Sequence, residues 1–392
     1  MARTKNSRAA SGSGSIRQRS DGLWEARISV GSDPATGRAI RRSIYGKTQR
    51  EVKTQMTAIL KQVDDKAYTP PTKMKMRDWL NQWMETYCKR KVKPLTYSSY
   101  EGIIKNHIIP AIGNIQLQQL NGKHIQDLYN TMTDAGLSGK TVKNVSAVLH
   151  KALNQAVTLK YIPLNPCIGS ELPASVKHEI RPLTDDEIPL FLNEIEDSPM
   201  RNAFALCLFA GLREGECLGL SWGQVDFQRG RITVSQQLQR EKKKGGEYYI
   251  ASSTKSGKAR TIEPPPIAFQ YLKAERNRQL ENRFKAAEAW NNSDNLVFTN
   301  ELGGHLAIIT FYRHFKKIAA AIGRPDARPH DLRHSCATVA LASGADIKSV
   351  QDLLGHATAS FTLDVYGHVS DKMKQDTAAR MQNYYDCLKK MG

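Results

Sequence analysis

Apolar and polar residues alternate along residues 14–46, and the clearest run consists of Trp24, Ala26, Ile28 and Val30. A turn-rich segment, GSDPATGR, leads from this run to a second alternating run at residues 39–45. Alternation with a period of two is typical of strands that bury one face. The pattern predicts a small three-stranded sheet at the start of the chain.

The spacing of apolar residues changes to three and four after Thr48, which forms a capping box with Glu51. The apolar positions are Val52, Met56, Ile59, Leu60 and Val63. This spacing predicts one amphipathic helix that covers a face of the sheet. A proline-bearing linker, KAYTPPTKM, follows at residues 66–74.

Four or five helices are predicted between Met76 and Leu159. The first has an apolar face, which we interpret as core, made of Trp79, Leu80, Trp83, Met84 and Tyr87. The second begins at Pro94 and is expected to stop at Pro110. Asn121 and Ser138 are expected to cap the next two.

The last part of the chain mixes helices with a few strands. Thr184 and Glu187 form a second capping box, and an apolar run at residues 204–212 predicts a buried helix. Strands are expected at residues 231–238, and residues 248–252 are expected to pair with 259–263 through the turn TKSGK. A final tail helix is expected at residues 371–390.

These patterns predict a multidomain protein with three parts. Residues 1–66 form a small α+β domain with a flexible basic N-terminus, residues 75–170 form an all-α domain, and residues 179–392 form a mixed, mainly-α domain with a small antiparallel sheet and the tail helix.

The net charge of +19 and the pI near 9.6 point to a polyanionic partner. The excess is uneven, because residues 1–66 and 67–178 each hold 14 basic and 6 acidic residues, whereas the longer remainder holds 29 and 26. The first two segments are therefore expected to bind DNA. Solubility alone is the alternative reason for such a charge.

Six cysteines without a CxxC pair indicate free thiols in a reducing cytosol. The longest apolar run is too short to cross a bilayer, and the first fifteen residues lack the apolar core of a signal peptide. These features predict a cytoplasmic protein with no membrane partner.

The segment from Arg328 to Tyr366 holds the clearest candidate chemistry. His330 and Arg333 lie three apart at the start of a predicted helix, so both side chains could reach one anion. Gly355 is expected to end a helix and to leave His356 in a turn. Thr358 or Ser360 can cap a short helix that carries Tyr366 near the same anion.

HDLRH, LGH and the tyrosine in LDVYGHV resemble the carboxy-terminal signature of the tyrosine recombinases, the phage integrase family, and most resemble integrases of conjugative transposons. The resemblance implies an earlier arginine and a lysine. FALCLFAGLREGECLGLSWGQVD matches the family's arginine motif at Arg213, with Glu216 as the residue that orients it. Lys255 in the TKSGK turn matches the lysine, and Lys258 is the neighbour most easily confused with it.

The chemistry of a phosphodiester gives each group a role. Arg213 and Arg333 would fork onto the two non-bridging oxygens, and Tyr366 would attack the phosphorus. His330 would accept the phenol proton, and Lys255 would protonate the departing 5′ oxygen. His356 would donate to a phosphate oxygen, and His334 is interpreted as a buried hydrogen-bonding residue. The product would be a 3′-phosphotyrosyl link, so no nucleotide, metal or other cofactor is expected.

The resemblance also implies partners. Double-stranded DNA would be bound at core sites by the helical domain and at arm sites by the first domain, as a homotetramer that passes through a Holliday junction, with accessory DNA-bending or excision proteins. The predicted DNA-binding residues are Arg17, Arg19, Arg27, Arg41, Arg42, Lys140, Lys143 and Lys151. The expected function is a site-specific integrase that inserts and excises a mobile element, associated with the bacterial nucleoid. A type IB topoisomerase-like enzyme that relaxes DNA, or a DNA-binding regulator without catalysis, are the alternatives.

Overall fold

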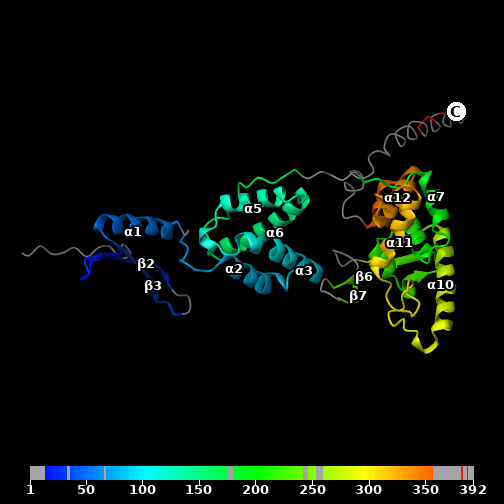
Figure 1. Cartoon of the computed structure of the whole chain (residues 1–392), viewed down its shortest axis with the longest axis horizontal. Helices are drawn as coiled ribbons and strands as arrows, with labels where there is room; N and C mark the ends of the chain where they lie inside the picture. Colours follow the sequence, from blue (N-terminus) through cyan, green and yellow to red (C-terminus); the bar gives the residue numbers. More distant parts are fainter. Residues whose placement is uncertain are drawn as a thin grey trace, which may run out of the picture. The chain divides into compact units, whose positions relative to one another are not determined.

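The computed structural model describes residues 14–32, 36–65, 68–174, 180–241, 246–252, 259–355, 381–382 and 386. It divides the chain into two compact units, residues 1–177 and 178–392 (Figure 1). The first unit contains two separate hydrophobic clusters, one under a sheet and one among helices. The boundaries of the three predicted domains stay predictions.

The first cluster belongs to a three-stranded antiparallel sheet of β1 (Ser15–Gln18), β2 (Trp24–Ser32) and β3 (Ala39–Gly46), in that order. Helix α1 (Gln49–Asp64) packs on one face and buries Val52 against Ala26 and Ile28. Thr48 caps α1 as predicted, by accepting a hydrogen bond from the Glu51 amide, 3.2 Å away. The Glu51 carboxylate, however, accepts from the amide of Lys47.

The second cluster is a helical bundle. Its helices are α2 (Met76–Trp83), extended by a π-helical turn η1 (Met84–Cys88), α3 (Pro94–Ile103), α4 (Ile109–Ile112), α5 (Gly122–Asp134) and α6 (Gly139–Thr158). Trp79, Leu80 and Trp83 lie in its core, as predicted. Asn121 and Ser138 accept the predicted capping hydrogen bonds.

Pro110 does not stop its helix, contrary to the prediction. The helical path continues from α3 through a π-helical turn, η2 (Ile104–Ile108), into α4 and ends at Ile112. A proline lacks an amide hydrogen and cannot join the regular ladder of α-helical bonds. Pro110 instead sits in the first turn of α4, directly after the wider turn, where a missing donor is tolerated.

The second unit holds one large core. Its first helices are α7 (Glu187–Glu194), α8 (Arg201–Ala210) and α9 (Glu214–Leu218). The later helices are α10 (Pro266–Ala286), α11 (Ile308–Ala321), α12 (Pro329–Ala342) and α13 (Ile347–Leu354). Helix α8 is buried almost throughout and packs against both α10 and α12, so it is the central support of the unit. The predicted box of Thr184 and Glu187 is present.

The strands of this unit form two small antiparallel sheets. One contains β4 (Val225–Asp226), β5 (Arg231–Val234) and β8 (Arg260–Ile262), and the other contains β6 (Gln236–Arg240) and β7 (Tyr248–Ser252). The predicted pairing of residues 248–252 with 259–263 is therefore wrong. The run at 231–238 divides at Ser235, and its two halves pair with different later strands.

No helix among the described residues is both long and apolar enough to cross a membrane. The five cysteines in the described part of the chain are free and buried.

Candidate functional site

Arg213 lies where a buried helix ends. Gly211 closes α8 in the left-handed conformation, with φ of 62°, and the chain then restarts as α9 with Arg213 as its N-cap. An added Cβ at Gly211 would lie 2.8 Å from a Leu354 methyl carbon, so only glycine fits this turn. The Arg213 side chain is 39% exposed, which leaves its guanidinium accessible on a rigid support, as predicted.

Glu216 is the centre of the charged network. Its side chain is 1% exposed, and its carboxylate accepts from Nη1 of Arg213 at 2.7 Å and from the Arg213 amide at 3.1 Å. Burial raises the pKa of Glu216, but the hydrogen bonds and charge of Arg260, followed by those of Arg213, outweigh it and lower the pKa to about 2. Glu216 is therefore ionised at neutral pH and fixes Arg213, the contact predicted from the spacing.

Arg260, at the start of β8, was not predicted. It forms a bidentate pair with Glu216, from Nη1 to Oε1 at 2.9 Å and from Nη2 to Oε2 at 2.6 Å, and its side chain is only 12% exposed. Its Nε donates to the carbonyl of Leu353 at 3.2 Å. The two partners are 44 and 93 residues away in sequence, so no local pattern indicated the contact.

Arg333 lies deep in the second unit. Its side chain is 1% exposed, and it donates to the carbonyl of Gly211 at 2.6 Å and to the carbonyl of Leu354. These carbonyls lie at the C-terminal ends of α8 and α13, where the partial negative charge of a helix favours a cation. Nη1 of Arg333 is also 3.9 Å from Oε2 of Glu216. Direct contact between Arg333 and a phosphate therefore stays a prediction.

His330 and His334 stack edge to face on α12, with ring centroids 4.7 Å apart. His330 keeps an exposed side, whereas His334 is 5% exposed, as expected for a buried residue. Burial, followed by the charges of His334, Arg333 and Arg213, lowers the pKa of His330 to about 4. Burial and the charge of Arg333 lower that of His334 to about 4. Both imidazoles are therefore neutral at pH 7, the form that can accept a proton.

Lys255, His356 and Tyr366 lie outside the described residues, as does Lys258. Most of the predicted tail helix lies outside them too. What the structure does place are the flanks: β7 ends before Lys255 and β8 begins after it, and Gly355 ends α13 with φ of 63°, the predicted helix stop before His356.

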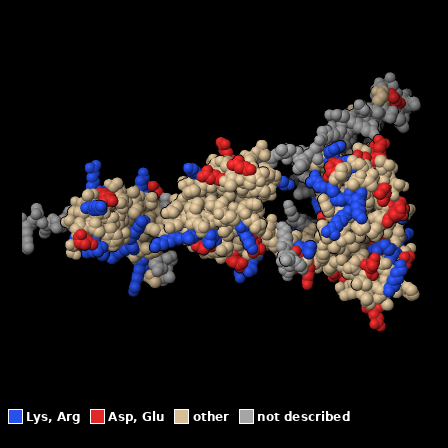
Figure 2. Space-filling view, viewed as in Figure 1, with Lys and Arg blue, Asp and Glu red and all other residues tan. Residues whose placement is uncertain are grey.

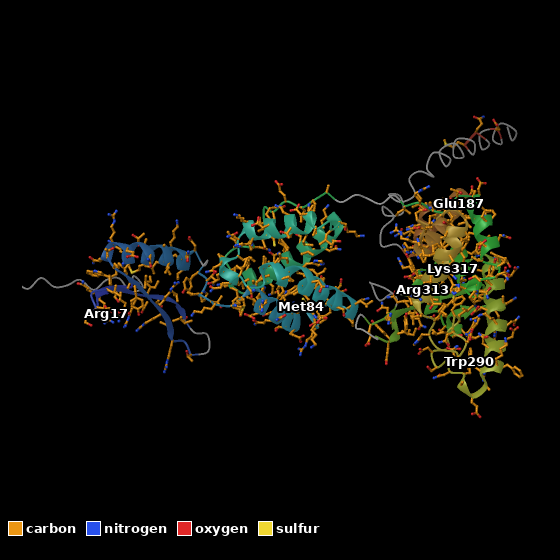
Figure 3. All side chains as sticks on the ribbon, viewed as in Figure 1. Arg17, Met84, Glu187, Trp290, Arg313 and Lys317 are labelled. Atoms are coloured by element: carbon orange, nitrogen blue, oxygen red, sulfur yellow. The ribbon has the colours of Figure 1, made fainter. Side chains whose placement is uncertain are left out.

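The open face of the N-terminal sheet carries arginines around Glu25, and Figure 3 labels one of them, Arg17. Arg17 and Arg27 both bind the Glu25 carboxylate, at 2.7 and 2.9 Å, and lower the pKa of this carboxyl to about 2 by these hydrogen bonds. The two arginines remain 61% and 52% exposed. Arg19 lies 5.2 Å from the ring centre of Tyr45, which is paired with Glu25 across the sheet.

Arg41 and Arg42, both predicted to bind DNA, lie on opposite faces of the sheet. Arg41 pairs with Ser29 and lies on the open face, whereas Arg42 pairs with Ile28 and lies on the face that α1 covers. Adjacent residues of a strand point to opposite faces, so the two arginines cannot both reach DNA through one face. Arg42 is accordingly only half-exposed, while Arg41 is exposed.

The three predicted lysines of α6, namely Lys140, Lys143 and Lys151, are all exposed. Their spacing of three and eight residues puts them on one side of the helix, which contains no Asp or Glu. Lys151 also lies 5.4 Å from the ring centre of Tyr100.

Helix α11 carries a second basic surface that the sequence analysis missed. Its residues Arg313 and Lys317 are exposed, lie four apart and occur in a helix without Asp or Glu (Figure 3). Figure 2 shows Lys and Arg gathered on the visible face of this unit. The signal available in the sequence was the basic and aromatic run FYRHFKK.

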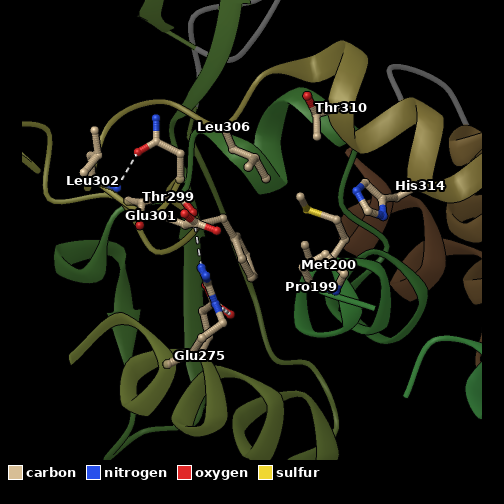
Figure 4. A pocket seen from close by; sticks show the side chains of 13 residues that line it. Pro199, Met200, Glu275, Thr299, Glu301, Leu302, Leu306, Thr310 and His314 are labelled. Carbon is tan, nitrogen blue, oxygen red and sulfur yellow. Dashed lines mark hydrogen bonds and ion pairs between the residues drawn. The ribbon is translucent and has the colours of Figure 1, made fainter. Parts of the chain in front are cut away.

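A cavity of about 440 Å³ lies elsewhere in the second unit (Figure 4). Its wall includes Met200, Phe298 and His314, and an ion pair in which the partly exposed Arg278 binds the buried Glu275 at 2.5 Å. Arg278 also donates to the Thr299 carbonyl, so this pair joins α10 to the loop before α11. None of the predicted catalytic residues that the structure describes lines the cavity. No cluster of potential metal ligands occurs among the described residues.

Comparisons with known proteins agree with these features. A model of the phage integrase family matches residues 181–373, and a model of the phage integrase N-terminal SAM-like domain matches residues 75–133. A XerC-like tyrosine recombinase from Caldanaerobacter subterraneus is 28% identical, over 92% of this chain and 96% of that protein. The ICEBs1 integrase of Bacillus subtilis is 22% identical, over 94% of this chain and 99% of that protein.

Solved structures share the fold. The Tn1549 transposon integrase in complex with transposon right end DNA superposes with a TM-score of 0.67 at 22% identity, over 78% of this chain and all of that one. A lambda integrase tetramer bound to a Holliday junction superposes with a TM-score of 0.56 at 19% identity, over 88% of this chain and 96% of that one.

Proposed function

We propose a reaction path for this chain from the premise that it belongs to the phage integrase family of tyrosine recombinases and is a site-specific DNA recombinase. It cuts and rejoins DNA through a covalent phosphotyrosyl intermediate, and thereby integrates and excises a mobile element. The proposal that it acts on mobile elements is supported by relatives named as the Tn1549 transposon integrase and the ICEBs1 integrase.

One observation carries the assignment of the site: Arg213 is half-exposed while a buried, ionised carboxylate fixes its guanidinium from behind. A surface arginine without such support loses side-chain entropy when it binds. Arg213 is already oriented, so it can bind a non-bridging phosphate oxygen and stabilise the charge that builds in the five-coordinate transition state. Arg333 adds a second positive charge close behind it.

Tyr366 attacks the scissile phosphorus, and the bond from phosphorus to the 5′ oxygen breaks. His330 accepts the phenol proton, which the neutral imidazole can do at pH 7. Lys255 donates a proton to the departing 5′ oxygen, and His356 donates a hydrogen bond to a phosphate oxygen. A free 5′ hydroxyl of another strand then attacks the phosphorus of the phosphotyrosyl link and gives its proton to Lys255. The bond from phosphorus to Tyr366 breaks, and the phenol takes its proton back from His330, so the bond energy is conserved without a nucleotide.

DNA is held by surfaces outside the reaction centre. We assign arm-site contacts to Arg17, Arg19, Arg27 and Arg41, and core-site contacts to the lysines of α6 and to Arg313 and Lys317 of α11. We expect four copies to assemble on two duplexes through a Holliday junction, as in the lambda integrase structure. Such an enzyme acts on chromosomal DNA, so we expect it in the bacterial cytoplasm on the nucleoid, aided by accessory DNA-bending or excision proteins.

Tyr366→Phe tests the nucleophile. On a nicked suicide substrate, from which the 5′ fragment is lost after cleavage, the wild type should accumulate a covalent adduct visible in a denaturing gel. The variant should form none, yet bind the same DNA with unchanged affinity in a mobility-shift assay. An adduct that persists in the variant would refute the assignment of Tyr366. Relaxation of supercoiled plasmid by monomers without a partner site would favour the topoisomerase alternative.

A further inference from the structure

Arg260 contacts two separate elements of the site, through the Glu216 carboxylate and the Leu353 carbonyl. Its guanidinium uses both Nη atoms on the Glu216 carboxylate and its Nε on the Leu353 carbonyl. Glu216 in turn holds Arg213. One side chain on β8 therefore joins α9 to the last turn of α13.

Arg333 contacts the same two elements, α9 and α13. It donates to the carbonyl of Leu354, the residue after the one that Arg260 binds, and lies 3.9 Å from Glu216. Arg213, Arg260 and Arg333 thus surround one carboxylate, and two of them also bind consecutive carbonyls at the end of α13. Because the three arginines share the Glu216 carboxylate, a displacement of one of them is expected to change the positions of the other two.

The packing leaves little freedom at this point. Gly355 follows the last turn of α13 with φ of 63°, and an added Cβ there would lie 2.8 Å from Cδ of Arg260. The glycine is required both by its left-handed backbone and by the arginine packed against it. Arg260 itself is 12% exposed, against 39% for Arg213, so it offers little surface to a substrate.

We infer that Arg260 is a positioning residue for the strand-transfer reaction: it holds Glu216 and the end of α13 together, and thereby sets the two arginines, Arg213 and Arg333, that act on the scissile phosphate. The inference rests on the proposed function. A lysine cannot replace Arg260, because a single ammonium group cannot form the bidentate pair and also reach the Leu353 carbonyl.

The test compares Arg260→Gln and Arg260→Lys with the wild type in single-turnover adduct formation on the suicide substrate. We expect the rate to fall about 100-fold in both variants, with DNA affinity within about threefold of wild type. Arg231→Gln is the matched control, because Arg231 lies in the same sheet and pairs with an exposed glutamate, Glu263. Its rate should be unchanged.

A second substrate separates positioning from general damage to the fold. In a methylphosphonate duplex the scissile group lacks one anionic oxygen, so it depends less on correctly placed arginines. On this substrate, the loss of rate in the Arg260 variants relative to the wild type should be at least tenfold smaller than on ordinary DNA. An equal defect on both substrates, or full activity of Arg260→Lys, would overturn the inference.

Gly355→Ala and the wild type serve as two further tests. If Arg260→Gln does not fold, Gly355→Ala displaces the same guanidinium and should show the same difference between the two substrates; equal loss on both would again count against the inference. A wild type that forms no adduct would instead refute the proposed function, so the two failures are distinguishable.

Discussion

Replacing Glu216 with glutamine removes the only negative charge that the described structure places among three guanidinium groups. The side chain is 1% exposed, so solvent cannot replace its charge. A pKa lowered from 4.5 to about 2 corresponds to roughly 3 kcal/mol of stabilisation at pH 7. Loss of one partner from a buried ion pair costs a similar amount, about 3–5 kcal/mol. For a unit of this size, this predicts a melting temperature lower by roughly 6–12 °C.

The assay is differential scanning calorimetry of the full chain, with the transition of the second unit assigned by hydrogen exchange in α8. Glu263→Gln is the control, because Glu263 is 66% exposed and pairs with an exposed arginine; its melting temperature should match that of the wild type. A Glu216→Gln variant that melts with the wild type would refute the view that this carboxylate holds the network together.

The same substitution predicts a pH dependence. The pKa of Glu216 is lowered by folding, so its stabilisation is complete above the ordinary value of 4.5 and is lost as the pH falls toward 2. The difference in stability between wild type and Glu216→Gln should therefore be constant from pH 7 to 5 and shrink between pH 4.5 and 2. A constant difference throughout would mean that the carboxylate charge is not its source.

Three further predictions concern catalysis and DNA binding. Lys255→Ala should lose cleavage of ordinary DNA and regain it on a 5′-phosphorothiolate substrate, whose sulfur leaves without an acid, while Lys258→Ala should need no rescue; the opposite pattern would make Lys258 the acid. Because the pKa of His330 is lowered to about 4, its ring protons in the chain without DNA should show no titration near pH 6.5, and a clear inflection there would contradict the neutral imidazole. Arg41→Ala should weaken arm-site binding and reduce its salt dependence, whereas Arg42→Ala should do neither, and equal effects would contradict the assignment of the open face.

Local signals in the sequence were sufficient for much of the fold. Asn121 and Ser138 cap their helices as predicted because a capping hydrogen bond spans only three residues. Gly211 and Gly355 end their helices for an equally local reason, the left-handed backbone that glycine adopts without a steric penalty. The contact between Arg213 and Glu216 is local too, because Arg213 is the N-cap of α9 and donates its amide to the Glu216 carboxylate three residues on.

Features that depend on distant parts of the chain could not be found in this way. The contact between Arg260 and Glu216 joins a strand and a helix that lie 44 residues apart in the sequence, and the exchange of strand partners at Ser235 depends on which segments are adjacent in space. The face of Arg42 is different, because strict alternation within a strand already assigns it to the side opposite Arg41.

The charges around Glu216 explain how this site can be stable without DNA and still bind a phosphodiester. Three guanidinium groups share a single carboxylate, so the network carries a net positive charge, part of which is offset by the helix ends that bind Arg333. A phosphodiester that binds Arg213 supplies a further negative charge and reduces the repulsion that these cations exert on protonated His330. The pKa of His330 should therefore rise when DNA binds, which strengthens the base at the moment when Tyr366 must lose its proton. An NMR titration of the histidine ring protons, with and without a core-site duplex in the Tyr366→Phe variant, measures this shift; an unchanged pKa would separate His330 from the network.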